Sequence, residues 1–174
     1  FPAQAEGDEV IFYESEKGDK ELGRLDFDLC IGKGRKDKFS VSQYFHSVDS
    51  GQFDAIGLQI TTASAGVEKG IKSFKEQNES ESALYLQGLS DRVAEDMAEY
   101  IHQLIWVRAG YKKENRGQRY SPGYPALTNL TGNHIIWNAL KAEDLGVTLT
   151  DANEFFPPST TAAVICFHKD AGYS

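Results

Sequence analysis

The chain has few of the residues on which metal and redox sites depend. Its two cysteines, Cys30 and Cys166, form no CxxC pair, a pattern typical of free thiols in a reducing, cytoplasmic environment. None of its histidines lies at the HxH, HxxE or HExxH spacing that would indicate a metal site. These histidines are His46, His102, His134 and His168.

Several common function classes lack their sequence fingerprints. There is no P-loop, no Rossmann glycine pattern and no GxSxG elbow. No apolar run approaches the roughly 18 residues of a transmembrane helix, and no signal peptide is visible. The net charge of −8 argues against nucleic acid as a partner, because phosphate contacts need clustered Lys and Arg. The basic stretches 33–38 and 108–119 are accordingly interpreted as solvated loops.

The size and the hydrophobic pattern predict one α+β domain over residues 1–174. A chain of 174 residues with 40% hydrophobic and 25% charged residues has the composition of a globular domain with one sizeable core. Alternating apolar residues predict strands, and apolar residues at helical spacing predict helices. The strands are expected at 9–14 and 21–27, joined as a hairpin, and at 53–61 and 162–167; the helices are expected at 64–77, at about 80–107 and from about 133 to before Gly146; 39–45 is either a strand or the start of a helix.

The longest predicted helix carries an apolar stripe and an acidic ladder. Asp91, Glu95 and Glu99 have the i, i+4, i+8 spacing that places carboxylates on one helix face, and a solvated surface is the usual interpretation of such a ladder. The apolar stripe is expected to pack on the core. Its members are Ala83, Leu86, Leu89, Val93, Met97, Tyr100 or Ile101, and Leu104.

The segment Arg119–Ala126 (RYSPGYPA) is the most informative in the chain. Two prolines bracket a glycine and a tyrosine; proline fixes φ and lacks an N–H, while glycine permits close backbone approaches. Such a stretch cannot be a regular helix or a central strand, so it predicts a rigid loop. A guanidinium, a phenol ring and bare backbone suit a small ligand with a carboxylate and a flat ring. A plain surface turn is the alternative that the pattern leaves open.

This segment resembles a ligand-binding motif of a known family. RxxxGYPA is similar to the S-adenosyl-L-methionine (AdoMet) motif in the C-terminal activation domain of cobalamin-dependent methionine synthase. The resemblance extends over nearly the whole chain in one collinear order. It includes Phe1-Pro2-Ala3 with Gly7-Asp8-Glu9, 54–59 (DAIGLQ), 88–95 (GLSDRVAE) with 98–102 (AEYIH), 146–150 (GVTLT), and Phe167-His168 with Tyr173.

The resemblance implies a fold and a set of AdoMet-binding residues, with no catalytic residue among them. The family's fold is a mostly antiparallel twisted sheet packed with helices. Arg119 would hold the AdoMet carboxylate, a contact that suits its planar guanidinium, and Glu95 would face the ligand's positive charges. The other expected contacts to AdoMet are Gln43, Ser121, Gly123, Tyr124, Ala126, Tyr173 and Ser174.

The resemblance also implies the cofactors and partners of a larger enzyme. The family's enzyme transfers a methyl group from methyltetrahydrofolate to homocysteine through cobalamin. Its activation domain restores oxidised cobalamin with AdoMet and one electron from a flavodoxin-type or diflavin reductase. The cobalamin-binding DxHxxG signature is absent from this sequence, so cobalamin is expected on another domain of the same chain, and zinc on a further one. The ends at Phe1 and Ser174 are accordingly interpreted as those of a piece of a multidomain protein.

Two departures from the family pattern leave other functions open. Gln43 takes the place of an aspartate that contacts the adenosyl group, and Asn129 takes the place of an aspartate that follows the GYPA motif. Both replacements remove a negative charge. A degenerate module that docks partners without binding AdoMet is therefore one alternative hypothesis. A free-standing small-molecule binding protein that uses the same rigid loop is the other.

Overall fold

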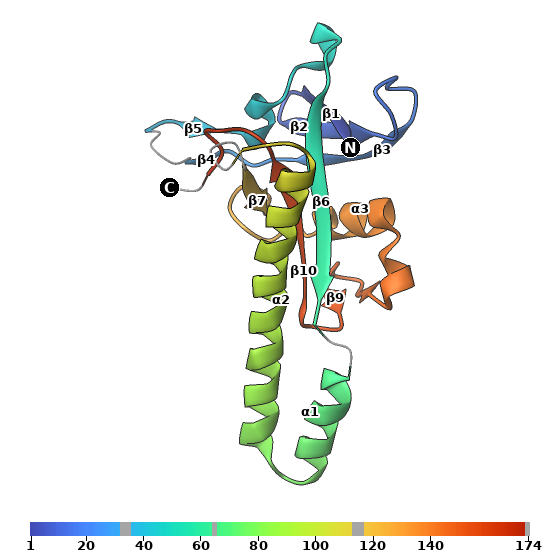
Figure 1. Ribbon diagram of the computed structural model, residues 1–174, viewed down its shortest axis with the longest axis vertical. Coiled ribbons are helices and arrows are strands. Elements are labelled where there is room, and N and C mark those ends of the chain that lie inside the picture. Colours follow the sequence, from blue (N-terminus) through green and yellow to red (C-terminus); the bar gives the residue numbers. More distant parts are fainter. Residues whose placement is uncertain (32–35, 64–65, 113–116, 173–174) are drawn as a thin grey trace.

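A six-stranded antiparallel sheet forms the centre of the molecule (Figure 1). The computed structural model of the chain describes residues 1–31, 36–63, 66–112 and 117–172. The sheet contains β1 (Pro2–Glu6), β2 (Glu9–Tyr13), β3 (Glu21–Asp26), β6 (Asp54–Thr62), β7 (Gln118–Tyr120) and β10 (Thr160–Cys166). Their order is β3-β2-β1-β6-β10-β7, and every neighbouring pair is antiparallel. The predicted α+β fold with a mostly antiparallel sheet is confirmed.

Helices and short strand pairs surround this sheet. The α-helices are α1 (Val67–Glu76), α2 (Ser80–Arg108) and α3 (Thr131–Leu140); the small pairs are β4 (Cys30–Ile31) with β5 (Lys38–Phe39) and β8 (Thr148–Leu149) with β9 (Phe155–Phe156); the 3₁₀ helices are η1 (Val41–Tyr44), η2 (Val48–Ser50) and η4 (Ala142–Leu145). The predicted strands and helices are confirmed within a few residues at their ends. The ambiguous segment 39–45 forms the end of β5 and then η1.

The two faces of β6 contact different helices. Successive side chains of a strand point to opposite faces, and Ile56 and Leu58 join the hydrophobic core, to which Ile136 of α3 also belongs. The alternate residues Gln59 and Thr61 point to α2 and hydrogen-bond its backbone carbonyls. The sheet is therefore covered by α3 on its apolar face and by α2 on a more polar one.

α2 is long enough to pack against both the sheet and a second helix. Its C-terminal half packs on β6 and β10, and its N-terminal half extends beyond the sheet as an antiparallel pair with α1 (Figure 1). The two helices approach closely at Gly70, where an added Cβ would lie 2.8 Å from a methyl carbon of Leu86. Gly70, which weakens a helix by its intrinsic propensity, is thus used for close packing.

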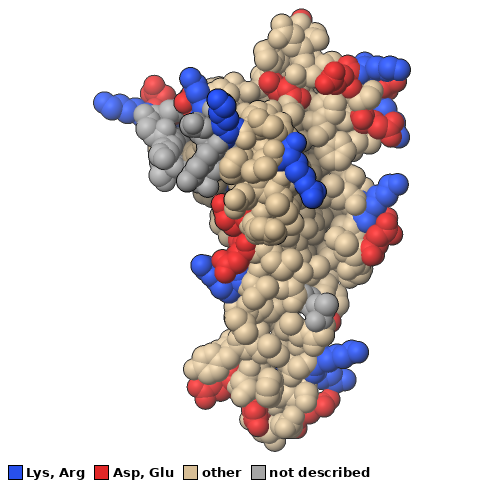
Figure 2. Space-filling view, in the orientation of Figure 1, with Lys and Arg blue, Asp and Glu red and all other residues tan. Residues whose placement is uncertain are grey.

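The predicted core stripe of α2 is confirmed at Ala83 and wrong for several of its larger members. Leu89, Val93 and Met97 are 62%, 41% and 43% exposed, and the surface over α2 is largely uncharged in Figure 2. Small side chains allow the helix backbone to approach the sheet closely, so they take the buried positions that larger apolar residues were expected to fill. The buried residues of α2 are Ala83, Ser90, Ala94, Ala98 and His102.

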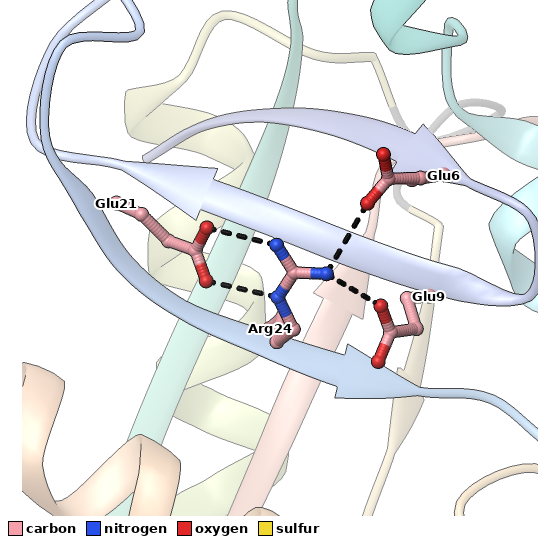
Figure 3. A network of polar contacts seen from close by, with 4 residues as sticks. All are labelled: Glu6, Glu9, Glu21 and Arg24. Atoms are coloured by element: carbon pink, nitrogen blue, oxygen red, sulfur yellow. Dashed lines mark hydrogen bonds and ion pairs between the residues drawn. The ribbon is translucent and has the colours of Figure 1, made fainter.

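An exposed ion-pair network joins the first three strands (Figure 3). Arg24 of β3 contacts Glu9 at 2.7 Å and Glu6 at 3.2 Å, and its Nε lies 3.0 Å from Glu21. Hydrogen bonds to Glu21 and Glu9 raise the pKa of Arg24 above its usual value. Because each pair is open to solvent, the network contributes little stability and mainly favours the observed strand register.

Candidate functional site

A cleft of about 300 Å³ lies between α2 and the segment that includes β7 and the loop after it. Its helical wall consists of Glu95, Glu99 and His102, which share one helix face because they lie at i, i+4 and i+7. The opposite wall is formed by Gly117, Gln118, Arg119, Ser121 and Tyr124. The RYSPGYPA segment and the acidic ladder, separate in the sequence, therefore meet in one site.

The pairing of β7 with β10 fixes the position of Arg119. Arg119 pairs with Ile165 of β10. Just before β7, Gly117 has a φ of +70°, and an added Cβ would collide with the backbone carbonyl of Cys166. Only glycine fits there, since other residues avoid positive φ and carry a Cβ.

The Arg119 side chain is held at the cleft by an ion pair. Its Nη2 lies 3.4 Å from Oε2 of Glu99, and the Arg119 side chain is only 18% exposed while that of Glu99 is 57% exposed. A guanidinium has five N–H donors in a fixed fork. One contact with Glu99 therefore leaves donors for a second acceptor, such as a ligand carboxylate.

The loop after β7 is closed by its own backbone. The Gly123 N–H donates to the Leu127 carbonyl at 2.8 Å, and the Leu127 N–H donates to the Tyr124 carbonyl at 2.8 Å. Gly123 has a φ of +89°, a conformation that favours glycine. Tyr124, at the tip of this turn, is 59% exposed, so its ring is available to a ligand. The predicted loop is present from Ser121 onward, whereas Arg119 and Tyr120 belong to β7 at the edge of the sheet.

Asp28 ties this loop to the segment after β3. Its Oδ2 accepts hydrogen bonds from both the backbone N–H and the hydroxyl of Thr128, each at 2.7 Å. The Asp28 N–H in turn donates to the carbonyl of the buried Ala126 at 3.1 Å. The backbone and side-chain hydrogen bonds from Thr128 lower the pKa of Asp28 below its usual value.

The structure places the predicted site residues in several different surroundings. Glu95, Arg119, Ser121 and Tyr124 line the cleft. Gly123 and Ala126 belong to the loop framework, with Ala126 fully buried. Gln43 is exposed in η1 and is not among the residues that line the cleft. The remaining two predicted contacts, Tyr173 and Ser174, lie outside the described residues.

Asn129, the second departure from the family pattern, has a local structural role. Its Oδ1 accepts a hydrogen bond from the backbone N–H of Thr131 at 2.9 Å, at the start of α3. It lines a separate cavity of about 130 Å³ next to β3. The loss of an aspartate charge here therefore has no direct bearing on the cleft.

Four of the residues that line the cleft were missed by the sequence analysis: Gly117, Gln118, His102 and Glu99. For Glu99 and the buried His102, the signal was present, because they follow Glu95 by four and seven residues and so lie on the same helix face. The interpretation of the acidic ladder as solvated is incomplete, since Glu99 pairs with Arg119. Asp91 likewise accepts a hydrogen bond from the Ser159 hydroxyl at 2.7 Å.

The chemistry of the lining fits a small ligand with one negative and more than one positive charge. Arg119 offers a cationic donor, Glu95 and Glu99 offer anionic acceptors, and Tyr124 offers a flat ring. Within the described ranges, no group of three or more His, Cys, Asp or Glu side chains is arranged to hold a metal ion. The described helices include none with the length and apolarity needed to cross a membrane.

Comparison with known proteins identifies a family and a structural relative. The whole chain, residues 1–174, matches the family described as vitamin B12 dependent methionine synthase, activation domain, which confirms the resemblance found in the sequence. A solved structure, described as the MetH reactivation domain bound to AdoHcy, matches with a TM-score of 0.86 and 23% identity, over 100% of this chain and 58% of that chain. At this identity the likeness shows a shared fold. The chain belongs to the family of activation domains of vitamin B12-dependent methionine synthase.

Proposed function

We propose that this chain binds AdoMet in the cleft between α2 and the loop after β7. The observation that carries the proposal is that Arg119 and Glu95, from elements far apart in the sequence, line one cleft of about 300 Å³. A structural relative is described as bound to AdoHcy, the demethylated form of the same compound. The charges of the cleft match an amino-acid carboxylate at one point and the positive groups of AdoMet at others.

Each part of the cleft has a proposed task. Arg119 donates charge-assisted hydrogen bonds to the ligand carboxylate, which lysine cannot copy in bidentate form. Tyr124 and the backbone of Ser121 and Gly123 shape the adenosyl pocket, and Glu95 provides negative charge for the ligand's cationic end. Further contacts from Gln43, and from Tyr173 and Ser174, remain predictions.

The proposed contribution of the chain is orientation and proximity. When bound, AdoMet supplies the methyl group for reductive methylation of cob(II)alamin. The cleft residues hold this ligand in one orientation and do no acid–base work, and such positioning is worth effective molarities on the order of 10⁵ M. We infer that cobalamin is carried by another domain of a cytoplasmic methionine synthase, and zinc by a further one. A flavodoxin-type or diflavin reductase is the proposed electron donor, and methyl transfer from methyltetrahydrofolate to homocysteine is the proposed overall reaction.

Calorimetric titration with AdoMet tests the proposal. The wild-type chain is expected to bind, and Arg119→Ala is expected to lose affinity by about tenfold or more, because a charge-assisted hydrogen bond contributes about 1.5–3 kcal/mol. Arg92→Ala is the matched control, since Arg92 is an exposed arginine that pairs with Asp96 on α2. Equal affinities of wild type and Arg119→Ala would contradict the assignment of the site.

A second candidate is a partner-docking module that no longer binds AdoMet. It is favoured by the position of Gln43, which is exposed and does not line the cleft. The same titration separates the two functions. Absence of AdoMet binding by a folded wild-type chain would favour the docking module.

A further inference from the structure

The ion pair between Arg119 and Glu99 places an anion beside the cation, which a site that binds only a carboxylate would not need. The two groups lie 3.4 Å apart and face the same cleft, one from strand β7 and the other from helix α2. A cation and an anion side by side complement a ligand that carries an anion and a cation on neighbouring atoms. The α-amino acid group has this arrangement, because its carboxylate and ammonium are attached to one carbon.

We propose that Glu99 and Arg119 together form a clasp for the α-amino acid end of the ligand. Arg119 takes the carboxylate, and Glu99 accepts hydrogen bonds from the ammonium. This inference rests on the proposed AdoMet-binding function and assigns Glu99 as a binding residue of that site. The 57% exposure of the Glu99 side chain leaves its carboxylate accessible to a ligand while it contacts the guanidinium.

The geometry of the cleft separates the task of Glu99 from that of Glu95. One helical turn, about 5.4 Å, lies between them. From Arg119 in β7 to Ser121, just after β7, the chain runs in the direction that leads from Glu99 to Glu95. The register of β7 with β10 and of β10 with β6, and the hydrogen bonds from β6 to α2, show this direction. A ligand held at Arg119 that extends past Ser121 therefore brings its sulfonium toward Glu95. Glu99 is left beside the ammonium.

Three adenosyl compounds distinguish these tasks. AdoMet carries the carboxylate, the ammonium and the sulfonium. S-adenosyl-L-homocysteine carries the same amino acid end with a neutral thioether. 5′-Methylthioadenosine has the neutral thioether and no amino acid end. A group that acts on the amino acid end must affect the first two compounds equally and leave the third unchanged.

The test is calorimetric titration of the 174-residue chain and its variants with these three compounds. Glu99→Gln is expected to weaken AdoMet and S-adenosyl-L-homocysteine by the same factor, about three- to tenfold for a half-exposed charged contact, without affecting 5′-methylthioadenosine. Glu95→Gln is expected to weaken AdoMet more than S-adenosyl-L-homocysteine. Asp96→Asn is the matched control, because Asp96 is an exposed carboxylate of the same helix that pairs with Arg92; it is expected to change no affinity.

Other results would overturn the clasp. Equal weakening of all three compounds by Glu99→Gln would show that Glu99 only supports the fold of the cleft. Unchanged or tighter AdoMet binding would show that Glu99 competes with the ligand for Arg119. Loss of AdoMet but not of S-adenosyl-L-homocysteine would assign Glu99 to the sulfonium instead. If the wild-type chain binds none of the three, the proposed function itself fails, and the clasp fails with it.

Discussion

The two faces of the central sheet are built from different kinds of side chain. The face toward α3 buries large apolar residues, among them Ile56, Val164 and Ile136, in one continuous core. The face toward α2 contains Gln59 and Thr61, which hydrogen-bond the carbonyls of the buried alanines Ala98 and Ala94.

This difference assigns a role to each face. Burial of large apolar side chains is the main source of folding free energy, so the α3 face stabilises the fold. Alanine contributes less burial but lets backbones approach closely, and directed hydrogen bonds fix the position of α2 along β6. The α2 face therefore determines where Glu95 and Glu99 lie relative to Arg119.

Ile136→Ala is expected to have the largest effect on stability. Ile136 is completely buried in the α3 core, and a large-to-small change at such a site costs about 4 kcal/mol of unfolding free energy. On the other face, Gln59→Leu is expected to cost only about 1 kcal/mol of unfolding free energy. The substitution loses one hydrogen bond, which destabilises the protein, but it also removes a buried Oε1 that has no partner among the described residues, which offsets part of the loss. Urea denaturation of both variants measures the contrast. Similar losses in the two would show that the faces contribute alike.

The sequence predicted the α3 face better than the α2 face for a physical reason. The alternating apolar residues at 53–61 and the apolar segment at 162–167 indicate buried strands, and both segments form central strands of the sheet. The buried stripe of α2 consists of alanines, Ser90 and His102. Apart from Ala83, none of these residues was assigned to the core, because small or polar side chains give a weaker hydrophobic signal than the larger residues that are exposed.

The candidate site was predictable in part. The proline and glycine content of RYSPGYPA indicated a rigid loop because backbone chemistry is local. The contact of Arg119 with Glu99 depends on the register of β7 with β10, and pairing between distant strands leaves no local signal. Gln43 was placed by collinear resemblance alone, and the structure locates it in η1 and not among the residues that line the cleft.

Gly117→Ala tests whether the site depends on the approach of β7 to β10. The substitution adds a Cβ against the Cys166 carbonyl at a residue with φ of +70°, and we expect a loss of about 3 kcal/mol together with loss of AdoMet binding. Gly7→Ala is the matched control: its φ is +64°, yet nothing lies within 4 Å of the added Cβ. The control is expected to lose only about 1 kcal/mol from backbone strain. Equal losses would mean that strain alone, and not contact with β10, selects glycine at 117.

Asp28→Asn tests the attachment of the loop and is expected to have a smaller effect. The substitution removes the negative charge that strengthens the two hydrogen bonds from Thr128, at a cost of about 1 kcal/mol. Because folding lowers the pKa of Asp28 from its usual value near 3.8, its contribution is complete above that value and is lost as the pH falls through the lower folded pKa. Denaturation at a series of acidic pH values is expected to show this loss in wild type and not in Asp28→Asn. An identical pH dependence of the two proteins would exclude Asp28 as its source.

Met97→Gln is expected to have the smallest effect, although it alters a large apolar residue of the longest helix. Met97 is 43% exposed, whereas its neighbour Ala98 is completely buried. Exposed substitutions that keep helix propensity change stability by less than about 0.5 kcal/mol, and glutamine matches methionine in length and propensity. Ala98→Gln at the next residue is expected to cost more, because it forces a longer side chain into the contact between α2 and the sheet. Urea denaturation of both variants, repeated at two protein concentrations, measures this. A loss above about 1 kcal/mol for Met97→Gln that grows with protein concentration would show that a second chain covers Leu89, Val93 and Met97 in solution. The α2 face would then have two roles, because it would stabilise the protein through association and would also position the site.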